Sequence, residues 1–70
     1  MQVKELSDFG KRVRSLRLER GLTQVQLGNI ANFDRNYIGM VERGERNPSL
    51  INLHRIAKAF GIPMSELFDY

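Results

Sequence analysis

The sequence contains no cysteine and only one histidine, His54. A disulfide framework and a thiolate metal site are therefore excluded, and since a lone histidine cannot build a zinc site we expect no bound metal. No stretch approaches the ~20 apolar residues of a membrane span, and the N-terminus lacks the apolar run of a signal peptide. These absences are compatible with a cytoplasmic protein.

The chain is also short of the length that a second domain would need. A protein of 70 residues buries only about 60% of the surface that its unfolded form would expose. Two prolines, 41% hydrophobic and 27% charged residues are typical of a folded globular domain and not of a disordered tail. We expect a single domain over residues 1–70, with one core and one function.

Acidic residues are fewer than basic ones in one part of the chain. Residues 11–46 contain eight basic and four acidic residues, whereas residues 47–70 contain two of each, within a net charge of +3. A basic half beside a neutral half indicates one side that faces a polyanion. Because many small domains are mildly basic, the charge alone does not identify nucleic acid as the partner.

No segment shows the alternating pattern of an amphipathic strand, and the chain divides into about five short helices. In the first, residues 7–20, an apolar stripe is formed by Phe9, Val13 and Leu16. Gly21 follows where a C-terminal cap favours a left-handed residue. The predicted fold class is therefore all-α.

The second and third helices follow each other after a very short turn. Thr23 and Gln26 have the spacing of a capping box, and this helix ends just before Asn32, a residue type that tolerates positive φ. Asp34 is placed to cap a third helix that ends at Gly44. A connection of about three residues favours the crossing of a helix-turn-helix, here residues 23–43, whose second helix can lie in the major groove of DNA.

A loop separates this unit from the rest of the chain. Ser49 is placed to cap a fourth helix that ends at Gly61, and residues 63–68 form one last turn or two. The predicted core face of the fourth helix consists of Leu50, Leu53, Ile56, Ala57 and Phe60.

Several sequence patterns extend over nearly the whole chain. The pattern T-Q-x-x-L-small-x-x-A is present as Thr23, Gln24, Leu27, Gly28 and Ala31. After the turn come the apolar Phe33, Ile38 and Val41, then an E-x-G ending at Glu42 and Gly44, and later P-S-L-x-x-L-x-x-I-A-x-A-F-G-I. Together these patterns resemble the phage-repressor and Cro class, the XRE-like helix-turn-helix family. Within it, D-R-N-Y-I-G-M-V-E-R-G-E-R-N-P-S is most similar to the small controller proteins of restriction–modification operons.

Two positions depart from the family pattern. Gly28 stands where the family usually has alanine, which costs ~1 kcal/mol of helix propensity, and Asn32 stands in the turn where glycine is commonest. Neither departure removes a functional group.

The resemblance implies a five-helix, lambda-repressor-like domain that acts as a sequence-specific transcriptional regulator. It would be a homodimer that places two recognition helices about 34 Å apart on a near-palindromic double-stranded DNA operator. No cofactor and no small-molecule ligand are expected. Because no serine has a companion base and there is no Gly-rich phosphate loop, no enzymatic activity is expected either. The expected location is the cytoplasm, in association with the nucleoid, for a protein of bacterial or phage origin. The alternatives are an antitoxin or phage-type repressor, and a protein-interaction module that reuses the fold.

Four side chains of the expected recognition helix are candidates for contacts to base edges: Arg35, Asn36, Tyr37 and Met40. Arginine can pair bidentately with guanine and asparagine with adenine. Arg35 and Asn36 would otherwise lie on a solvated helix start. Tyr37 could contact DNA or pack on the loop, and Met40 could instead fill space.

Four more residues are expected to contact phosphates: Gln24, Arg43, Arg46 and Asn47. Gln24 begins the first motif helix, whose free N–H groups and positive dipole end face the same anion. The other three follow the recognition helix, and Arg46 could instead be solvated. Such contacts fix the register of a protein on DNA without specifying sequence.

The resemblance implies structural roles for two other groups. Arg17 is expected to pair with Glu42 and so to orient the recognition helix. The C-terminal helix is expected to supply the dimer contact, unless its apolar residues pack onto the core of their own chain. The residues concerned are Met64, Leu67, Phe68 and Tyr70.

Overall fold

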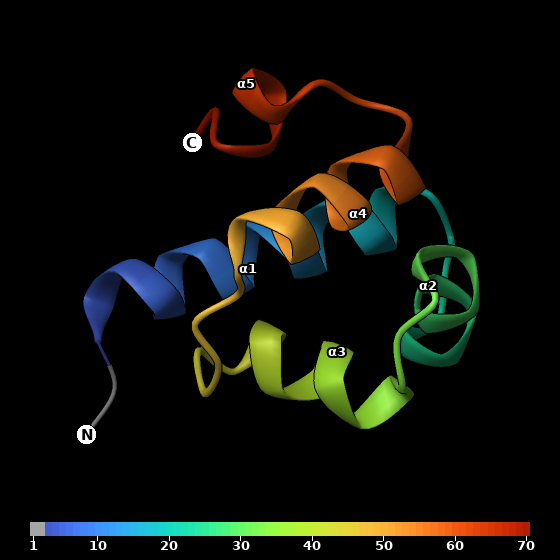
Figure 1. The fold of residues 1–70 in the computed structure, drawn as a ribbon, viewed down its shortest axis with the longest axis horizontal. Coiled ribbons are helices and arrows are strands. Elements are labelled where there is room, and N and C mark those ends of the chain that lie inside the picture. Colours follow the sequence, from blue (N-terminus) through green and yellow to red (C-terminus); the bar gives the residue numbers. More distant parts are fainter. Residues whose placement is uncertain (1–2) are drawn as a thin grey trace.

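The structure is a computed structural model that describes residues 3–70. These residues form five α-helices and no strand: α1 (Lys4–Glu19), α2 (Gln24–Ala31), α3 (Arg35–Glu42), α4 (Leu50–Phe60) and α5 (Met64–Leu67). In Figure 1, α3 and α5 lie at opposite edges of the molecule, with α1 and α4 between them. The prediction of an all-α fold with five short helices is confirmed.

The first helix begins one turn earlier than predicted. Its first turn carries no apolar stripe, but Lys4 Nζ donates a hydrogen bond of 2.6 Å to Asp8 Oδ2. This hydrogen bond lowers the pKa of Asp8 and raises the pKa of Lys4. Pairs with this i, i+4 spacing support a helix surface, and a search based on apolar periodicity does not detect them.

The caps around the helix-turn-helix form as the sequence predicts. The Thr23 hydroxyl accepts a hydrogen bond from the Gln26 backbone N–H, and Gln26 Oε1 accepts one from the Thr23 N–H, at 3.0 and 2.8 Å. Asn32 is left-handed with φ of 62°. Asp34 Oδ1 accepts from the backbone N–H of Asn36 at 2.7 Å. The turn between α2 and α3 is therefore confined to residues 32–34.

All five helices contribute to one hydrophobic core. Its buried residues are Phe9, Val13, Leu16, Leu27, Ile38, Val41, Ile56, Ala57, Phe60 and Leu67. The prediction that Leu50 belongs to the core is wrong, since 67% of this residue is exposed. The first turn of α4 extends beyond the core, and Leu53 is the first leucine of that helix to pack against it.

Two glycines allow backbone segments to approach very closely. A Cβ atom on Gly10 of α1 would lie 2.4 Å from the carbonyl oxygen of Val41 in α3. A Cβ atom on Gly28 would lie 2.5 Å from the carbonyl oxygen of Phe33. The alanine that the family usually has at position 28 would therefore require the turn of this chain to shift.

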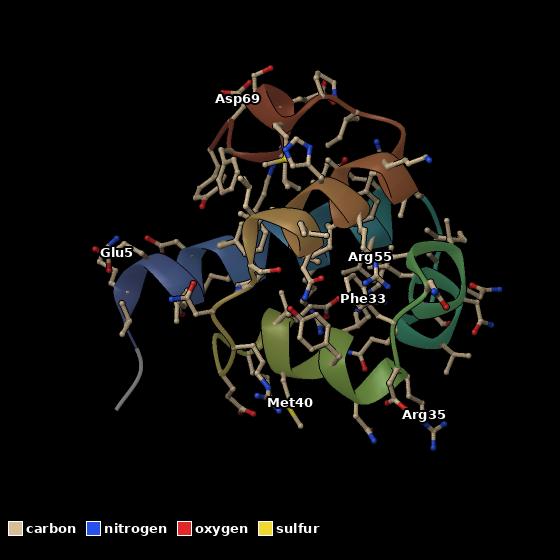
Figure 2. All side chains as sticks on the ribbon, viewed as in Figure 1. Glu5, Phe33, Arg35, Met40, Arg55 and Asp69 are labelled. Atoms are coloured by element: carbon tan, nitrogen blue, oxygen red, sulfur yellow. The ribbon has the colours of Figure 1, made fainter. Side chains whose placement is uncertain are left out.

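Arg55 of α4 holds the turn between α2 and α3 in place through hydrogen bonds and a cation–π contact. Its guanidinium donates to the backbone carbonyls of Ala31 and Asn32, and it lies 3.9 Å from the centre of the Phe33 ring. Figure 2 shows Arg55 and Phe33 close together between α4 and α3. The position of α3 therefore depends on a residue from the next helix.

Two other arginines join segments that are distant in the sequence. Arg12 donates to the carbonyl oxygen of Glu66 at 2.7 Å, and Arg20 donates to that of Phe60 at 3.2 Å. Both bonds go to carbonyls near helix C-termini, which have no partner within their own helix, although the Glu66 carbonyl also accepts from the Asp69 backbone N–H. They attach α5 and the end of α4 to α1.

Candidate nucleic-acid interface

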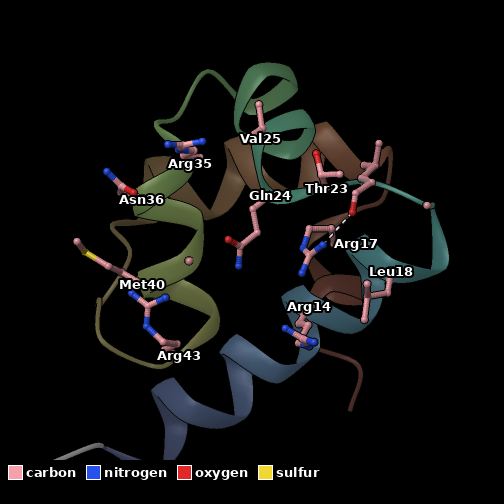
Figure 3. Close-up of a pocket in the computed structure, with 13 residues that line it drawn as sticks. Arg14, Arg17, Leu18, Thr23, Gln24, Val25, Arg35, Asn36, Met40 and Arg43 are labelled. Atoms are coloured by element: carbon pink, nitrogen blue, oxygen red, sulfur yellow. Dashed lines mark hydrogen bonds between the residues drawn. The ribbon is translucent and has the colours of Figure 1, made fainter.

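One side of the molecule carries an open groove of about 920 Å³ that is bordered by α1, the start of α2 and α3. We call it the α1–α3 groove. The side chains that line it include Arg14, Gln24, Arg35, Asn36, Met40 and Arg43. Figure 3 shows Arg14 on α1 and Arg43 just after the end of α3 at opposite sides of this groove, with Gln24 between the helices. The structure thus brings most of the predicted DNA-contacting residues to one surface.

The first turn of α3 presents the predicted base-contacting residues. Arg35 and Asn36 are exposed, whereas Ile38 and Val41 on the other face of the helix are buried in the core. In Figure 2, Arg35 and Met40 point away from the body of the molecule. The helix is thus anchored by one face, and the other is available to a partner.

Tyr37 is engaged within the fold. Its ring lies 4.7 Å from that of Phe33, and its hydroxyl accepts a hydrogen bond of 3.1 Å from Asn52 Nδ2 of α4. The alternative left open by the sequence was packing on the loop, whereas the structure places Tyr37 against Phe33 of the turn and Asn52 of α4. A contact from Tyr37 to DNA stays a prediction. Such a contact would have to keep the Tyr37 ring packed against Phe33.

The ion pair expected between Arg17 and Glu42 is present and buried. Arg17 Nε donates to Glu42 Oε2 at 2.7 Å and Nη2 donates to Oε1 at 3.0 Å, and the two side chains are 8% and 3% exposed. Gln24 Nε2 donates to Glu42 Oε1 at 3.1 Å, and Arg17 Nη1 donates to the Leu22 carbonyl at 2.9 Å. Glu42 therefore ties α1 and α2 to the end of α3. The phosphate contact of Gln24 stays a prediction.

Arg43 directly follows α3 and forms an exposed ion pair. Its Nε donates to Glu45 Oε2 at 2.9 Å and its Nη2 donates to Oε1 at 3.2 Å. This hydrogen bonding lowers the pKa of Glu45. A Cβ atom on Gly39 would lie 3.1 Å from Arg43 Nη1, so the glycine leaves room for the guanidinium along α3.

The loop after α3 carries the two remaining predicted phosphate contacts. Arg46 and Asn47 are both exposed, and Arg46 Nε donates to Met40 Sδ at 3.2 Å. This contact places the Arg46 side chain against the outer face of α3. Phosphate binding by either residue stays a prediction.

The structure corrects the predicted dimer surface. Leu67 is fully buried in the core of its own chain, so its side chain has no surface to offer to a second chain, and the prediction for this residue is wrong. Met64 is half-buried against the same core. Phe68 stacks on Phe9 at 5.3 Å yet stays 43% exposed, and Tyr70 is 62% exposed.

Arg14 is a candidate that the sequence interpretation missed. It is exposed and lies on the wall of the α1–α3 groove that α1 provides. Its position three residues before Arg17 places both arginines on the same side of the helix. This spacing could have identified it, but only the structure shows that this side of α1 faces α3.

Two other features, a metal-binding cluster and a helix able to span a membrane, are absent from the described part of the chain. Residues 3–70 contain no group of three or more histidine, cysteine, aspartate or glutamate residues that could hold a metal ion. None of the helices in this region has the length and apolar character needed to cross a membrane.

Residues 13–67 match a family model described as helix-turn-helix. The chain belongs to this helix-turn-helix family. It is 40% identical to the control protein C.BamHI of Bacillus amyloliquefaciens over 63 residues, which are 89% of this chain and 78% of that protein. It is 47% identical to the immunity repressor protein of Bacillus phage phi105 over 58 residues, which are 83% of this chain but only 40% of that repressor.

Solved structures of restriction–modification controller proteins have the same fold. The restriction–modification controller protein C.AhdI from Aeromonas hydrophila has a TM-score of 0.92 and 45% identity, over 94% of this chain and all of that one. The controller protein C.Esp1396I, as a tetramer in complex with its natural 35-base-pair operator, has a TM-score of 0.84 and 34% identity, over 91% and 84% of the two chains. The predicted family and its resemblance to controller proteins are confirmed.

Proposed function

We propose that this protein is a sequence-specific, double-stranded-DNA-binding transcriptional regulator that acts as a homodimer. The observation that carries the proposal is the exposed first turn of α3, where Arg35 and Asn36 border a groove that also contains Arg14 and Arg43. Arginine and asparagine at this position can hydrogen-bond to guanine and adenine in the major groove. Arg14 and Arg43 can bind the phosphates that flank the major groove of the DNA.

Among such regulators, the proposed role is that of a restriction–modification controller protein. The similarity to C.AhdI extends over the whole of that chain, and C.Esp1396I is a controller protein seen on its operator. The phage phi105 repressor supports a phage-type repressor as the second candidate, although the match spans less than half of it. The relatives are named as repressors and control proteins, in line with a non-enzymatic role. Such a protein, of bacterial or phage origin, acts in the cytoplasm in association with the nucleoid.

The homodimer requires an apolar surface, and two exposed pairs of side chains are available. Phe68 and Tyr70 follow α5, and Leu50 and Ile51 begin α4, where they are 67% and 72% exposed. We expect Tyr70→Asp or Ile51→Asp to shift the protein toward monomer in sedimentation equilibrium. If neither variant changes the association, the dimer contact lies elsewhere on the surface.

The proposal is tested by selecting bound duplexes from a random pool. The selected sites should contain two half-sites whose centres are about one helical turn apart, because a two-fold dimer inserts one α3 into each of two successive major grooves. If Arg14, Arg43 and Arg46 each neutralise one phosphate, the log–log salt slope should be about −5 per dimer, since each contributes about 0.9.

A matched pair of variants tests the role of α3. Arg35→Glu should abolish the preference for the selected duplex over a scrambled one, with an unchanged melting temperature. Lys58→Glu makes the same charge change on α4, away from the α1–α3 groove, and should retain the preference. If no duplex is enriched, or if Arg35→Glu keeps full specificity, the proposed function is wrong and a protein-interaction module is favoured.

A further inference from the structure

Glu45 forms an ion pair with Arg43, the proposed phosphate-binding cation that directly follows α3. Both of its carboxylate oxygens accept hydrogen bonds from the Arg43 guanidinium, at 2.9 and 3.2 Å. The pair is exposed, with side-chain exposures of 58% for Arg43 and 47% for Glu45. It is therefore within reach of an incoming polyanion.

The Glu45 carboxylate binds the Arg43 guanidinium in the same way as a phosphate group would bind it. Arginine binds carboxylates and phosphates alike through two parallel N–H donors. Two oxygens of one phosphate would take up the same nitrogen atoms, Nε and Nη2, that Glu45 occupies. A phosphate and Glu45 cannot both hold this edge of the guanidinium.

We propose that Glu45 competes with DNA phosphate for Arg43 and thereby lowers the affinity of the protein for DNA. The inference rests on the proposed function, because it needs Arg43 to bind phosphate in the complex. Its consequence is that Glu45 limits binding to arbitrary DNA, which is dominated by phosphate contacts. Sites that also offer base contacts to Arg35 and Asn36 still bind, so Glu45 restricts the protein to them.

The expected effect is modest, because both partners are solvated. Exposed ion pairs contribute little, and releasing Arg43 from one corresponds to about a two- to fivefold gain in affinity. Glutamine at position 45 keeps the size of the side chain and removes its charge. We therefore expect Glu45→Gln to bind a scrambled duplex more tightly than the natural protein, by about two- to fivefold for each subunit that contacts the DNA.

A matched control separates this competition from the overall charge. Glu66→Gln removes the same single negative charge from α5, which lies at the opposite edge of the molecule from α3 (Figure 1). The second control is Arg43→Gln, alone and together with Glu45→Gln. Dissociation constants for the four proteins of this cycle and for Glu66→Gln are measured by fluorescence anisotropy at low salt, on a scrambled and on a selected duplex.

The cycle gives a definite outcome. Competition for Arg43 predicts that Glu45→Gln tightens binding, that Glu66→Gln does not, and that the gain disappears when Arg43 is also replaced. If the gain persists without Arg43, Glu45 acts by general repulsion of DNA, and the inference is wrong. It is also wrong if Glu45→Gln binds no more tightly than Glu66→Gln. If one of these two contradicting results is found but Arg43→Gln still loses affinity, only the inference about Glu45 fails and the proposed function stands. If the natural protein binds neither duplex, the proposed function itself is refuted.

Discussion

Replacement of Glu42 by alanine should destabilise the protein more than any other single loss of a charged group. Glu42 accepts three hydrogen bonds, two from Arg17 and one from Gln24, at 2.7, 3.0 and 3.1 Å. In Glu42→Ala the Arg17 guanidinium keeps its bond to the Leu22 carbonyl. It remains a buried cation without a counter-charge, because only 8% of its side chain is exposed.

The size of the effect follows from this burial. Removing one partner of a buried ion pair costs about 3–5 kcal/mol, because the remaining charge is left unpaired in a medium of low dielectric constant. A domain of this length has a total stability of roughly 4–10 kcal/mol. The substitution should therefore remove between a third and all of it, and lower the melting temperature by about 12 °C or more.

The measurement is urea and thermal denaturation followed by circular dichroism at 222 nm. Glu45→Ala is the matched control, because it deletes the same side chain from the exposed pair with Arg43, three residues away, and should change the melting temperature little. The double variant Arg17→Met/Glu42→Leu should lose less stability than Glu42→Ala, since it leaves no buried charge unpaired. A loss below about 1 kcal/mol in Glu42→Ala would show that the pair behaves as an exposed one, and would refute the reasoning.

Three further predictions concern the attachment of the helices and the extent of the groove. Arg55→Ala should cost about 2 kcal/mol in urea denaturation, because the turn loses its charged hydrogen bonds and the cation over Phe33; an unchanged stability would contradict the role of Arg55. Gly10→Ala should also destabilise by about 2 kcal/mol or more, although alanine favours helices, because α1 must move away from α3; a more stable variant would contradict the close contact. Arg14→Glu should weaken binding to a scrambled duplex far more than Lys58→Glu does, and equal effects would remove Arg14 from the interface.

The parts of the fold that the sequence predicted are those that depend on neighbouring residues. A capping box needs only Thr23 and Gln26, and the start of α3 needs only Asp34, so their spacing in the sequence is sufficient. Ile38 and Val41 were placed in the core correctly for the same reason, because one helix determines which of its residues share a face. Such rules operate within about one helical turn.

The errors concern contacts between segments that are distant in the sequence. The burial of Leu67 and the exposure of Leu50 depend on where α4 and α5 lie relative to α1, which no local pattern specifies. Arg55 hydrogen-bonds to Ala31, 24 residues earlier in the chain. No motif marks an arginine whose partner is a backbone carbonyl, since every residue has one, and so this role could not be predicted.

The arginines show why the basic charge alone was a weak indication of DNA binding. Arg12, Arg17, Arg20 and Arg55 donate to backbone carbonyls or to Glu42 of their own chain. Their guanidinium groups join segments of the fold, so these four cations add to the net charge although at least part of each is engaged within the chain. What distinguishes a DNA-facing arginine is the surface on which it lies, which in this protein is the α1–α3 groove. Because a guanidinium has five donors, one residue type supplies both the attachments that hold α3 in place and the contacts that we propose α3 makes.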